Sequence, residues 1–484
     1  MDDQSPPSSG IDAFQDLERW LSGQAAASAG LSELERESER RGREILRLAL
    51  QGHIDARGDR DVGEAVVLAS RKESVRLAHK RVHTRPLVTL FGEVKVTRIG
   101  YGARGQEAIH PLDAELMLPG RLWSYECQRR LLRAVICGPF DEAIALVAEI
   151  TGTTIPKRSA EQLVQDAAVD FDSFYAARDA DTIAPADGEI LVGAIDCKGI
   201  PMVKPDGAIK VVRRGKGEKA NKKKMATVAA VHSQPTIIRT PKDVIDSLFG
   251  TQDPSERPKR PRPNRKRVWA SLTAGKDAFI TDVKTEMTRR DPKHERTWVI
   301  VTDGERALQR RVITSFENVT LVLDLLHVLE KLWKVAHALH PEGSPEAEAF
   351  ARQRTERILC GMTGQVVKGL RQIVTKRRLT GQKAKTIHGV CDYLYRNHER
   401  MRYDEYMRNG WPIASGTVEG ACKNLIRDRF ERSGMRWTIP TAEALLKLRA
   451  AHLSGDLNDY WEHHIKLDQQ RLYRQAEWQP IPSS

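Results

Sequence analysis

The sequence predicts an α/β fold whose sheet is preceded by a mainly helical region. From residue 188 onward, short apolar segments typical of buried strands alternate with segments of helical periodicity, as in layered α/β proteins. Before that point, residues 31–81 carry charged residues with an apolar spacing near 3.6, which is typical of helices. A length of 484 residues suggests several domains rather than one.

The N-terminal part divides into a tail and a region expected to bind DNA. Residues 1–30 are rich in Ser, Ala and Gly, and we expect them to be flexible. The alternating segment 89–105 predicts a β-hairpin. Two helices, 140–150 and 156–168, are joined by TGTTI, which fits either a helix-turn-helix that reads DNA or an ordinary helical hairpin. In the first case, polar side chains of the second helix would enter a groove: Lys157, Arg158, Gln162 and Gln165.

The region that begins at residue 188 is predicted to hold five strands. EILVGAIDCKG is the first, KMATVAAVHSQ the second and PTIIRT the third. WASLTAGKDAFITDVKTEMTRRD then predicts a helix with a loose start, TWVIVTDG the fourth strand, ERALQRRVITSF a helix and VTLVLDLLHV the fifth strand. The predicted boundaries are a flexible tail (1–30), a helical and hairpin DNA-binding region (31–187), a first part of the catalytic core (188–327), a helical insertion (328–409), a second part of the core (410–455) and a C-terminal tail (456–484).

The charge balance favours a polyanionic partner. Lys and Arg total 78 against 65 Asp and Glu, which gives a net charge of +13, although a basic proteome background would give the same balance. Two strongly basic segments, 213–224 and 253–267, interrupt the strands. They could neutralise DNA phosphates or be solvated loops, and we favour DNA contact.

The cysteines and the N-terminus predict a cytoplasmic protein. The six cysteines contain no CxxC pair, so we expect reduced thiols rather than a disulfide framework or a zinc ribbon. The first residues, MDDQSPPSSG, lack the apolar core of a signal peptide, and no run of about 18 apolar residues predicts a membrane span.

Three carboxylates stand where a metal site could form. Asp196 lies in the C-terminal part of the first strand, Asp303 ends the fourth, and Glu419 stands near the start of a late helix. Mg²⁺ prefers such oxygen ligands, and two ions can stabilise both the attacking and the leaving oxygen of a phosphoryl transfer. Each acid also has an ordinary interpretation: a turn residue, a helix N-cap, and an ion-pair partner of Lys423.

Several motifs resemble bacterial insertion-sequence DDE transposases of the ISKra type, which are related to Mutator-like transposases. The motifs are LFGEVKVTRIGY, HPLDAELMLP, AIDCKGIPM, VTDGERAL, LDLLHVLEKLW and GWPIASGTVEGACKNLIRDRFERSGMRW. The resemblance implies an RNase H-like catalytic domain and a catalytic, metal-binding triad of Asp196, Asp303 and Glu419. It also implies a cofactor of two Mg²⁺ ions, with Mn²⁺ as a substitute.

The same resemblance implies roles for further residues. Asp324 and His327 match a Cys/Asp-x-x-His motif and would support the active site, whereas the alternative is a helix N-cap beside a buried helix histidine. Basic residues after Glu419 would face DNA, and Trp437 would either stack on a strand or belong to the core. This DNA-facing set is Lys423, Arg427, Arg429, Arg436 and Trp437. The basic run 368–378 of the insertion would contact transposon-end DNA.

The predicted function is transposition. The enzyme would cut transposon ends and join them to target DNA by metal-dependent phosphoryl transfer. Its partners would be double-stranded DNA, namely the terminal inverted repeats and the target, and a second copy of the chain, at least as a dimer on DNA. A nuclease that only hydrolyses DNA and a non-catalytic DNA-binding protein are the alternatives.

Overall fold

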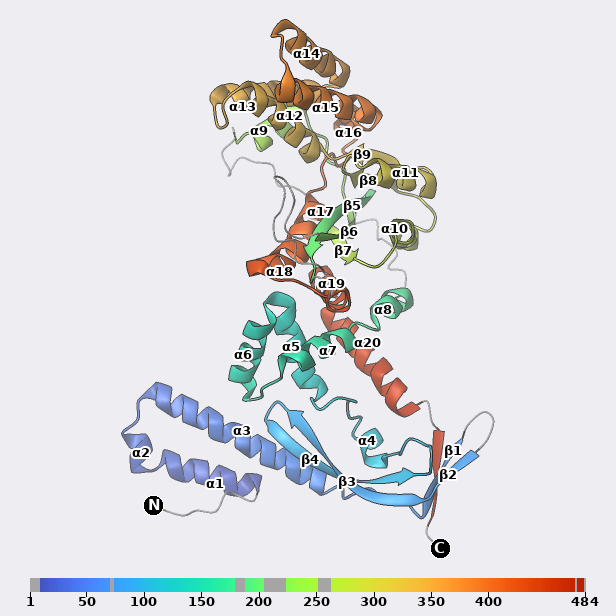
Figure 1. Ribbon diagram of the computed structural model, residues 1–484. Coiled ribbons are helices and arrows are strands. Elements are labelled where there is room, and N and C mark those ends of the chain that lie inside the picture. The colour runs from blue at the N-terminus through green and yellow to red at the C-terminus, as the bar shows by residue number, and fades with distance from the viewer. Residues whose placement is uncertain are drawn as a thin grey trace, which may run out of the picture. The chain divides into compact units, whose positions relative to one another are not determined.

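The computed structural model divides the chain into two compact units (Figure 1). Unit 1 combines Met1–Phe174 with Asn458–Ser484, and unit 2 is Tyr175–Leu457. The structure describes residues 9–69, 74–178, 188–203, 223–250, 263–474 and 477–482.

Unit 1 begins with a helical hairpin. Helices α1 (Gly10–Leu21), α2 (Gln24–Ala27) and α3 (Leu31–Asp55) follow one another, and α1 packs against α3. The side chain of Ser9 accepts from the backbone of Asp12, and that of Asp12 accepts from Ser9. Such a capping box satisfies orphan donors at a helix start. Residues 10–27, predicted to be flexible, are therefore helical, because capping and packing on α3 stabilise them.

Two small sheets complete the β structure of unit 1. Strands β3 (His79–Thr89) and β4 (Gly92–Gly102) form an antiparallel hairpin with a two-residue turn, so the predicted hairpin exists but its first strand precedes residue 89. The second sheet has the order β10-β1-β2 and joins β1 (Ala65–Ala69) and β2 (Ser74–Leu77) to β10 (Glu477–Ile481). The segment predicted as a C-terminal tail instead forms α20 (Leu457–Gln469) and β10, because β10 satisfies its backbone hydrogen bonds on β1.

The remaining helices of unit 1 follow the hairpin. They are α4 (Pro111–Glu115), α5 (Tyr125–Cys137), α6 (Phe140–Thr151) and α7 (Lys157–Asp166), with α8 (Phe171–Ala177) at the boundary. Helix α6 ends at Gly152, whose φ of 68° is the left-handed conformation that glycine adopts readily. The two helices of the predicted helix-turn-helix are therefore present as α6 and α7.

Unit 2 is built on a mixed five-stranded sheet of order β7-β6-β5-β8-β9. Strands β5 (Ile190–Pro201), β6 (Lys223–Gln234) and β7 (Asn264–Ser271) pair antiparallel, whereas β8 (Thr297–Thr302) and β9 (Thr320–Leu323) run parallel to β5. Helices α9 (Pro241–Leu248), α10 (Lys276–Arg290) and α11 (Arg306–Ser315) connect them. The alternation of strands and helices predicted from the sequence is thus confirmed as a mixed α/β unit.

The third strand was assigned to the wrong segment. PTIIRT is an extended connection whose backbone bonds leave the sheet: Ile237 N donates to Gly410 O and Arg239 N to Met407 O. The third strand is β7, in which Val268, Trp269 and Ala270 are buried, so the predicted helix begins only at Lys276. The central strands bury both faces, and their apolar runs form the core of the unit.

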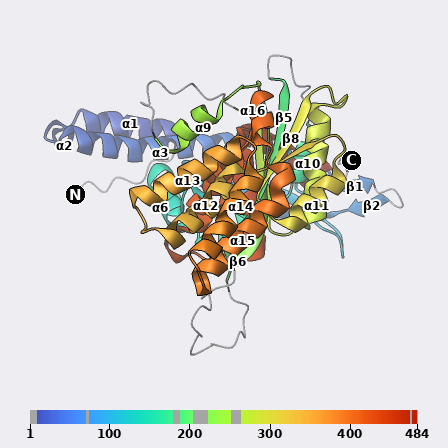
Figure 2. The same cartoon turned by 90° about the horizontal axis from the view of Figure 1, so that it is seen from above.

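Helices fill the region between β9 and the segment that carries Glu419. They are α12 (Leu325–Leu339), α13 (Pro345–Leu359), α14 (Thr363–Lys376), α15 (Gly381–Asn397) and α16 (Tyr403–Arg408), and α12 to α15 form one block in Figure 2. Then come α17 (Gly416–Ala421), a π-helical segment (Cys422–Arg427), α18 (Asp428–Phe430) and α19 (Ile439–Ser454). Within the described ranges, no helix is both long and apolar enough to cross a membrane.

The two basic segments, 213–224 and 253–267, lie mostly outside the described residues, because 213–222 and 253–262 are not described. Of the second, Arg267 belongs to β7, where it pairs with Glu286 and stacks on the ring of Tyr175 at 3.6 Å. Arg267 therefore has a structural role, and the prediction of DNA contact for the segment 253–267 rests on its other residues. All six cysteines are free thiols.

Candidate active site

Two of the predicted catalytic acids lie side by side at one end of the unit 2 sheet. Ile195 of β5 pairs with Thr302 of β8 in parallel register. Asp196 directly follows Ile195, and Asp303 directly follows Thr302. Adjacent strands are about 4.8 Å apart. The carboxylates of Asp196 and Asp303 are therefore neighbours, although 107 positions (303 − 196) separate them in the chain.

Asp196 is held by two donors. Its Oδ1 accepts from the backbone N–H of Cys197 at 2.6 Å, and its Oδ2 accepts from the thiol of Cys422 at 3.2 Å. Burial and the charge of Asp196 raise the pKa of Cys422, so this thiol keeps its proton and remains a donor. Cys422 directly follows α17, and its contact docks the helix that carries Glu419 onto Asp196.

Asp303 lies in a short turn between β8 and α11. Its Oδ1 accepts from the backbone N–H of Glu305 at 3.0 Å, and its carbonyl accepts from Gln309 at 3.1 Å. Burial raises the pKa of Asp303 despite the hydrogen bond from Glu305, and the negative charge of Asp196 raises it further. Two like charges in a partly buried site repel each other, and a bound cation would remove that repulsion.

Glu419 stands one helical turn before Cys422 on α17. Residues three apart in a helix share a face, so Glu419 belongs to the side of α17 that meets β5. Its side chain is nevertheless exposed, and among the described residues no group of three or more His, Cys, Asp or Glu side chains is placed to bind a metal ion. The structure thus brings Asp196 and Asp303 together and leaves the carboxylate of Glu419 outside that pair.

Asp324 follows β9 and is the N-cap of α12. One oxygen accepts from Leu326 N at 2.8 Å, and the other accepts from the hydroxyl of Ser415, just before α17. Nδ1 of His327 lies 3.5 Å from the same carboxylate, an ion-pair distance. Both oxygens of this buried carboxylate therefore have structural partners, and Asp324 ties the start of α17 to the end of the sheet.

His327 is a cation beside these carboxylates. Its interaction with Asp324 outweighs partial burial, and together with the charges of Asp196 and Asp303 it raises the pKa of His327 to about 9. The imidazole is therefore protonated at neutral pH. Asp324 is indeed the N-cap of α12, as the alternative interpretation proposed. His327, however, is only partly buried, and its charge interacts with those of Asp196 and Asp303.

Two residues of the helical insertion reach the turn after Asp303, and sequence patterns did not indicate them. Tyr393 of α15 packs on Gly304 so closely that a Cβ atom at Gly304 would lie 2.2 Å from its ring. The ammonium of Lys331, on α12, lies 5.1 Å from the centre of that ring. Gly304, in the motif VTDGER, was the one visible signal, because a close approach of this kind requires glycine.

The basic residues after Glu419 divide between surface and core. Lys423, Arg427 and Arg436 are exposed, as a DNA contact requires. Arg429 is fully buried and stacks on Trp437, with its guanidinium carbon 4.8 Å from the ring centre. The prediction that Arg429 faces DNA phosphates is therefore wrong. Its neighbour Phe430 is fully buried as well, so this part of the segment faces the core.

Trp437 belongs to the core, which was the alternative considered for it. Only 6% of it is exposed, its indole N–H donates to the carbonyl of Phe430 at 3.1 Å, and the two rings pack 4.9 Å apart. The prediction that Trp437 stacks on a DNA strand is therefore wrong, and Trp437 packs in the core.

The four DNA-binding candidates of unit 1 lie on α7. Lys157 and Gln162 are exposed but contact acidic neighbours: Lys157 pairs with Asp141 at 2.7 Å, and Gln162 donates to Asp166 at 3.0 Å. Arg158 is exposed, and Gln165 is partly buried.

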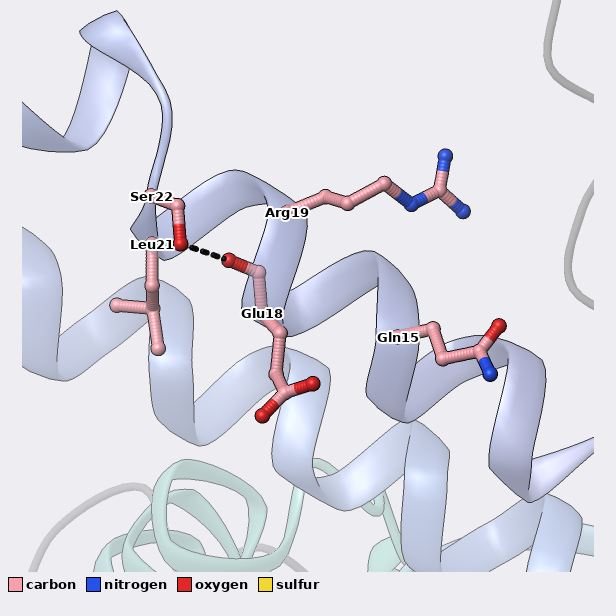
Figure 3. A pocket seen from close by; sticks show the side chains of 5 residues that line it. All are labelled: Gln15, Glu18, Arg19, Leu21 and Ser22. Carbon is pink, nitrogen blue, oxygen red and sulfur yellow. Dashed lines mark hydrogen bonds between the residues drawn. The ribbon is translucent and has the colours of Figure 1, made fainter.

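A surface hollow on unit 1 contains none of these residues. It lies along α1 and is lined by Gln15, Glu18, Arg19, Leu21 and Ser22 (Figure 3). Ser22 donates from its hydroxyl to the carbonyl of Glu18 at 2.9 Å, an ordinary contact at a helix end. Because consecutive turns of one helix form this open hollow, it is not a candidate for the predicted chemistry.

Comparison with known proteins gives a weak structural likeness. No protein-family model matches the sequence, and no curated protein matches it. The chain is similar to a solved structure described as the Drosophila P element transposase strand transfer complex, with 11% identity and a TM-score of 0.25. The alignment covers 72% of this chain and 85% of that one. A likeness at this score carries no argument, so function must be argued from the site itself.

Proposed function

We propose that the protein is a DDE transposase with an RNase H-like catalytic domain interrupted by the helical insertion 328–409. One observation carries the proposal: Asp196 and Asp303 stand directly after the last parallel pair of β5 and β8, and the helix that bears Glu419 is docked on Asp196 through Cys422. The sheet order supports it, because three antiparallel strands followed by two strands parallel to the first are what an RNase H-like domain requires.

Asp196, Asp303 and Glu419 would hold two Mg²⁺ ions, or Mn²⁺ in their place. When bound, such ions stabilise the charge on the attacking and leaving oxygens of a phosphodiester. Two features of the residues fit this cofactor: both acids offer hard oxygen ligands, and the pKa of Asp303 is raised first by burial and further by the charge of Asp196, a repulsion that a cation would relieve. Glu419, the third ligand of the proposal, stands a single helical turn from Cys422, which contacts Asp196.

The surrounding residues position the reacting DNA. Protonated His327 and Lys331 add positive charge beside the carboxylates, where phosphate oxygens must be held. Asp324 fixes His327 and, through Ser415, the start of α17. These contacts hold the elements of the site in place before substrate binds, and positioning contributes much of the rate of phosphoryl transfer.

A covalent enzyme intermediate is not part of this reaction. Cys197 and Cys422 flank Asp196, but burial raises the pKa of Cys197 to about 11 and raises that of Cys422 as well, with the charge of Asp196 adding to both. Both thiols are protonated at neutral pH and are poor nucleophiles. Water would therefore attack the phosphodiester at the transposon end, and the freed 3′-hydroxyl would attack target DNA.

DNA recognition is shared between the units. Lys423, Arg427 and Arg436 would contact phosphates near the site. Lys157, Arg158, Gln162 and Gln165 of α7 would read the terminal inverted repeats, because Arg and Gln pair with base edges in the major groove. Two copies of the chain would assemble on the two transposon ends.

Cleavage and strand transfer test the proposal together. Asp196→Asn, Asp303→Asn and Glu419→Gln should each abolish Mg²⁺-dependent cleavage of end-labelled transposon DNA while binding persists. Glu317→Gln, an exposed acid before β9, is the matched control and should cleave normally. Cleavage without joining to target DNA would indicate a nuclease, and binding without cleavage by the unmodified chain would indicate a non-catalytic DNA-binding protein.

A further inference from the structure

A second basic surface lies on the helical insertion. Between Glu356 and Asp392 the chain has no acidic residue, and this stretch contains all of α14 and the first half of α15. A groove along α14 and α15 is lined by Lys368, Arg371, Gln372, Lys376 and Tyr395, among others. Lys368, Arg371 and Lys376 recur at helical spacing on one exposed face of α14, so this side of the groove is positively charged.

Tyr395 gives this groove an aromatic surface. It is 61% exposed, which is unusual for a large aromatic residue on a helix that packs against a neighbour. The ring of His398 stacks nearly parallel to it at 5.6 Å and 18°, which holds its orientation. The guanidinium carbon of Arg371 lies over the ring at 6.0 Å from its centre, the outer limit of a cation–π contact, and Tyr395 stays largely exposed beside it.

The groove has room for a flat group beside Tyr395. Gly364 lies on the same face of α14, and a Cβ atom there would meet nothing within 4 Å. Asp392 is an acid close to the basic wall: its Oδ1 lies 3.6 Å from Arg371, and both side chains are more than half exposed. Exposed ion pairs contribute little free energy, so a phosphate would replace Asp392 at small cost.

We propose that the groove between α14 and α15 binds single-stranded DNA, with an unpaired base stacked on Tyr395 and the adjacent phosphates on Lys368, Arg371 and Lys376. An exposed aromatic ring within a basic groove is the combination that binds unpaired strands, because every base has a face that can stack. Duplex DNA already stacks its bases internally and would use only the cations. The choice of DNA as the ligand rests on the proposed function, whereas the preference for unpaired strands rests on Tyr395.

The test measures binding by the full-length chain without divalent metal, so that no cleavage occurs. Fluorescence anisotropy would compare a labelled oligothymidylate of about 20 nucleotides with a duplex of the same length, at one salt concentration. Tyr395→Ala should raise the Kd for the single strand at least about fivefold, since loss of stacking on one base costs about 1–3 kcal/mol. Its Kd for duplex should change less than about twofold.

Tyr395→Phe is the matched control, because it keeps the ring and removes only the hydroxyl. It should bind the single strand within about twofold of the unmodified chain. Arg371→Ala should weaken binding of both DNAs and reduce the salt dependence of each. Unchanged circular dichroism would establish that Tyr395→Ala still folds.

Three results would overturn the proposal: no binding of the single strand by the unmodified chain, an unchanged Kd for Tyr395→Ala, or equal losses on both DNAs. These outcomes are separate from those of the cleavage test. Failure of cleavage with a Tyr395-dependent preference intact would reject the transposase and keep the groove, and the reverse result would reject the groove alone.

Discussion

Replacing Asp303 with Asn should make the metal-free protein more stable. Two unit charges about 5 Å apart repel by about 3 kcal/mol at an effective dielectric constant near 20, and solvent access lowers this figure. Because Asp303 and Asp196 are neighbours in this way, Asp303→Asn should raise the free energy of unfolding by about 1–3 kcal/mol in the presence of EDTA.

The pH dependence has a defined sign. The pKa of Asp303 is raised in the folded protein above its ordinary value of 3.8, mainly by burial and then by Asp196. The folded state therefore binds this proton more tightly than the unfolded state. The advantage of Asp303→Asn should be complete above the raised pKa and should disappear as the pH falls through that pKa toward 3.8.

Adding Mg²⁺ should make the unmodified chain more stable than Asp303→Asn, which reverses their order of stability in EDTA. A ligand present at 100 times its Kd stabilises the folded state by about 2.7 kcal/mol. The unmodified chain should gain such an amount in Mg²⁺, and Asp303→Asn should gain much less because it lacks one ligand. Thermal unfolding with and without Mg²⁺ measures this, with about 2–4 °C in Tm per kcal/mol for a unit of this size.

Glu317→Gln serves as the control for both arms, because this exposed acid precedes β9 and has no part in the site. It should match the unmodified chain in EDTA and in Mg²⁺. An equal rise in Tm for Asp303→Asn and the unmodified chain on adding Mg²⁺ would refute the reasoning, since the metal would then bind without Asp303.

Three further substitutions test the packing around the site. Gly304→Ala should lower cleavage strongly and reduce the free energy of unfolding in urea by about 1–3 kcal/mol, because its Cβ would enter the ring of Tyr393. Gly389→Ala is the control, because a Cβ at Gly389 meets nothing within 4 Å. Glu286→Gln should cost about 3–5 kcal/mol in the same assay, because three arginines around this buried acid would lose their partner. Burial raises the pKa of Glu286, but the three arginines outweigh it and lower that pKa to about 2. The contribution of Glu286 to the free energy of unfolding should therefore be lost as the pH falls from 4.5 toward 2. Arg429→Ala should lower Tm and leave the salt dependence of DNA binding unchanged, whereas a reduced salt dependence with a normal Tm would restore it as a phosphate contact.

The sheet of unit 2 was largely predictable, because buried strands carry continuous apolar runs. β5, β6, β8 and β9 were assigned from such runs, and β8 and β9 are followed by helices as expected. β7 was missed because NRKRV opens with charged residues, and Arg267 becomes a core residue only through Glu286 and Tyr175. Local pattern could not distinguish it from a loop, since its partners lie elsewhere in the chain.

The candidate site was predictable in its acids and not in its surroundings. Asp196 and Asp303 were found because each directly follows an apolar run, and the parallel pairing of β5 with β8, whose last pair is Ile195 and Thr302, brings the two residues together. The thiol of Cys422, the ring of Tyr393 and the hydroxyl of Ser415 had no local signal, because each meets the site across at least 85 residues of chain. Arg429 was misplaced because its charge was considered without its position on the inner face of the helix.

By itself, the sequence determined which residue types are available: strands rich in Val, Ile and Ala, acids at their ends, and a basic excess suited to DNA. Only the tertiary structure decided which of these groups meet. Parallel pairing of β5 with β8 sets two carboxylates against each other, the contact from Cys422 places a third acid one helical turn away, and burial assigns Arg429 and Trp437 to the core. The physical reason is that charge and periodicity are local properties of the chain, whereas desolvation, repulsion and packing depend on neighbours that only folding supplies.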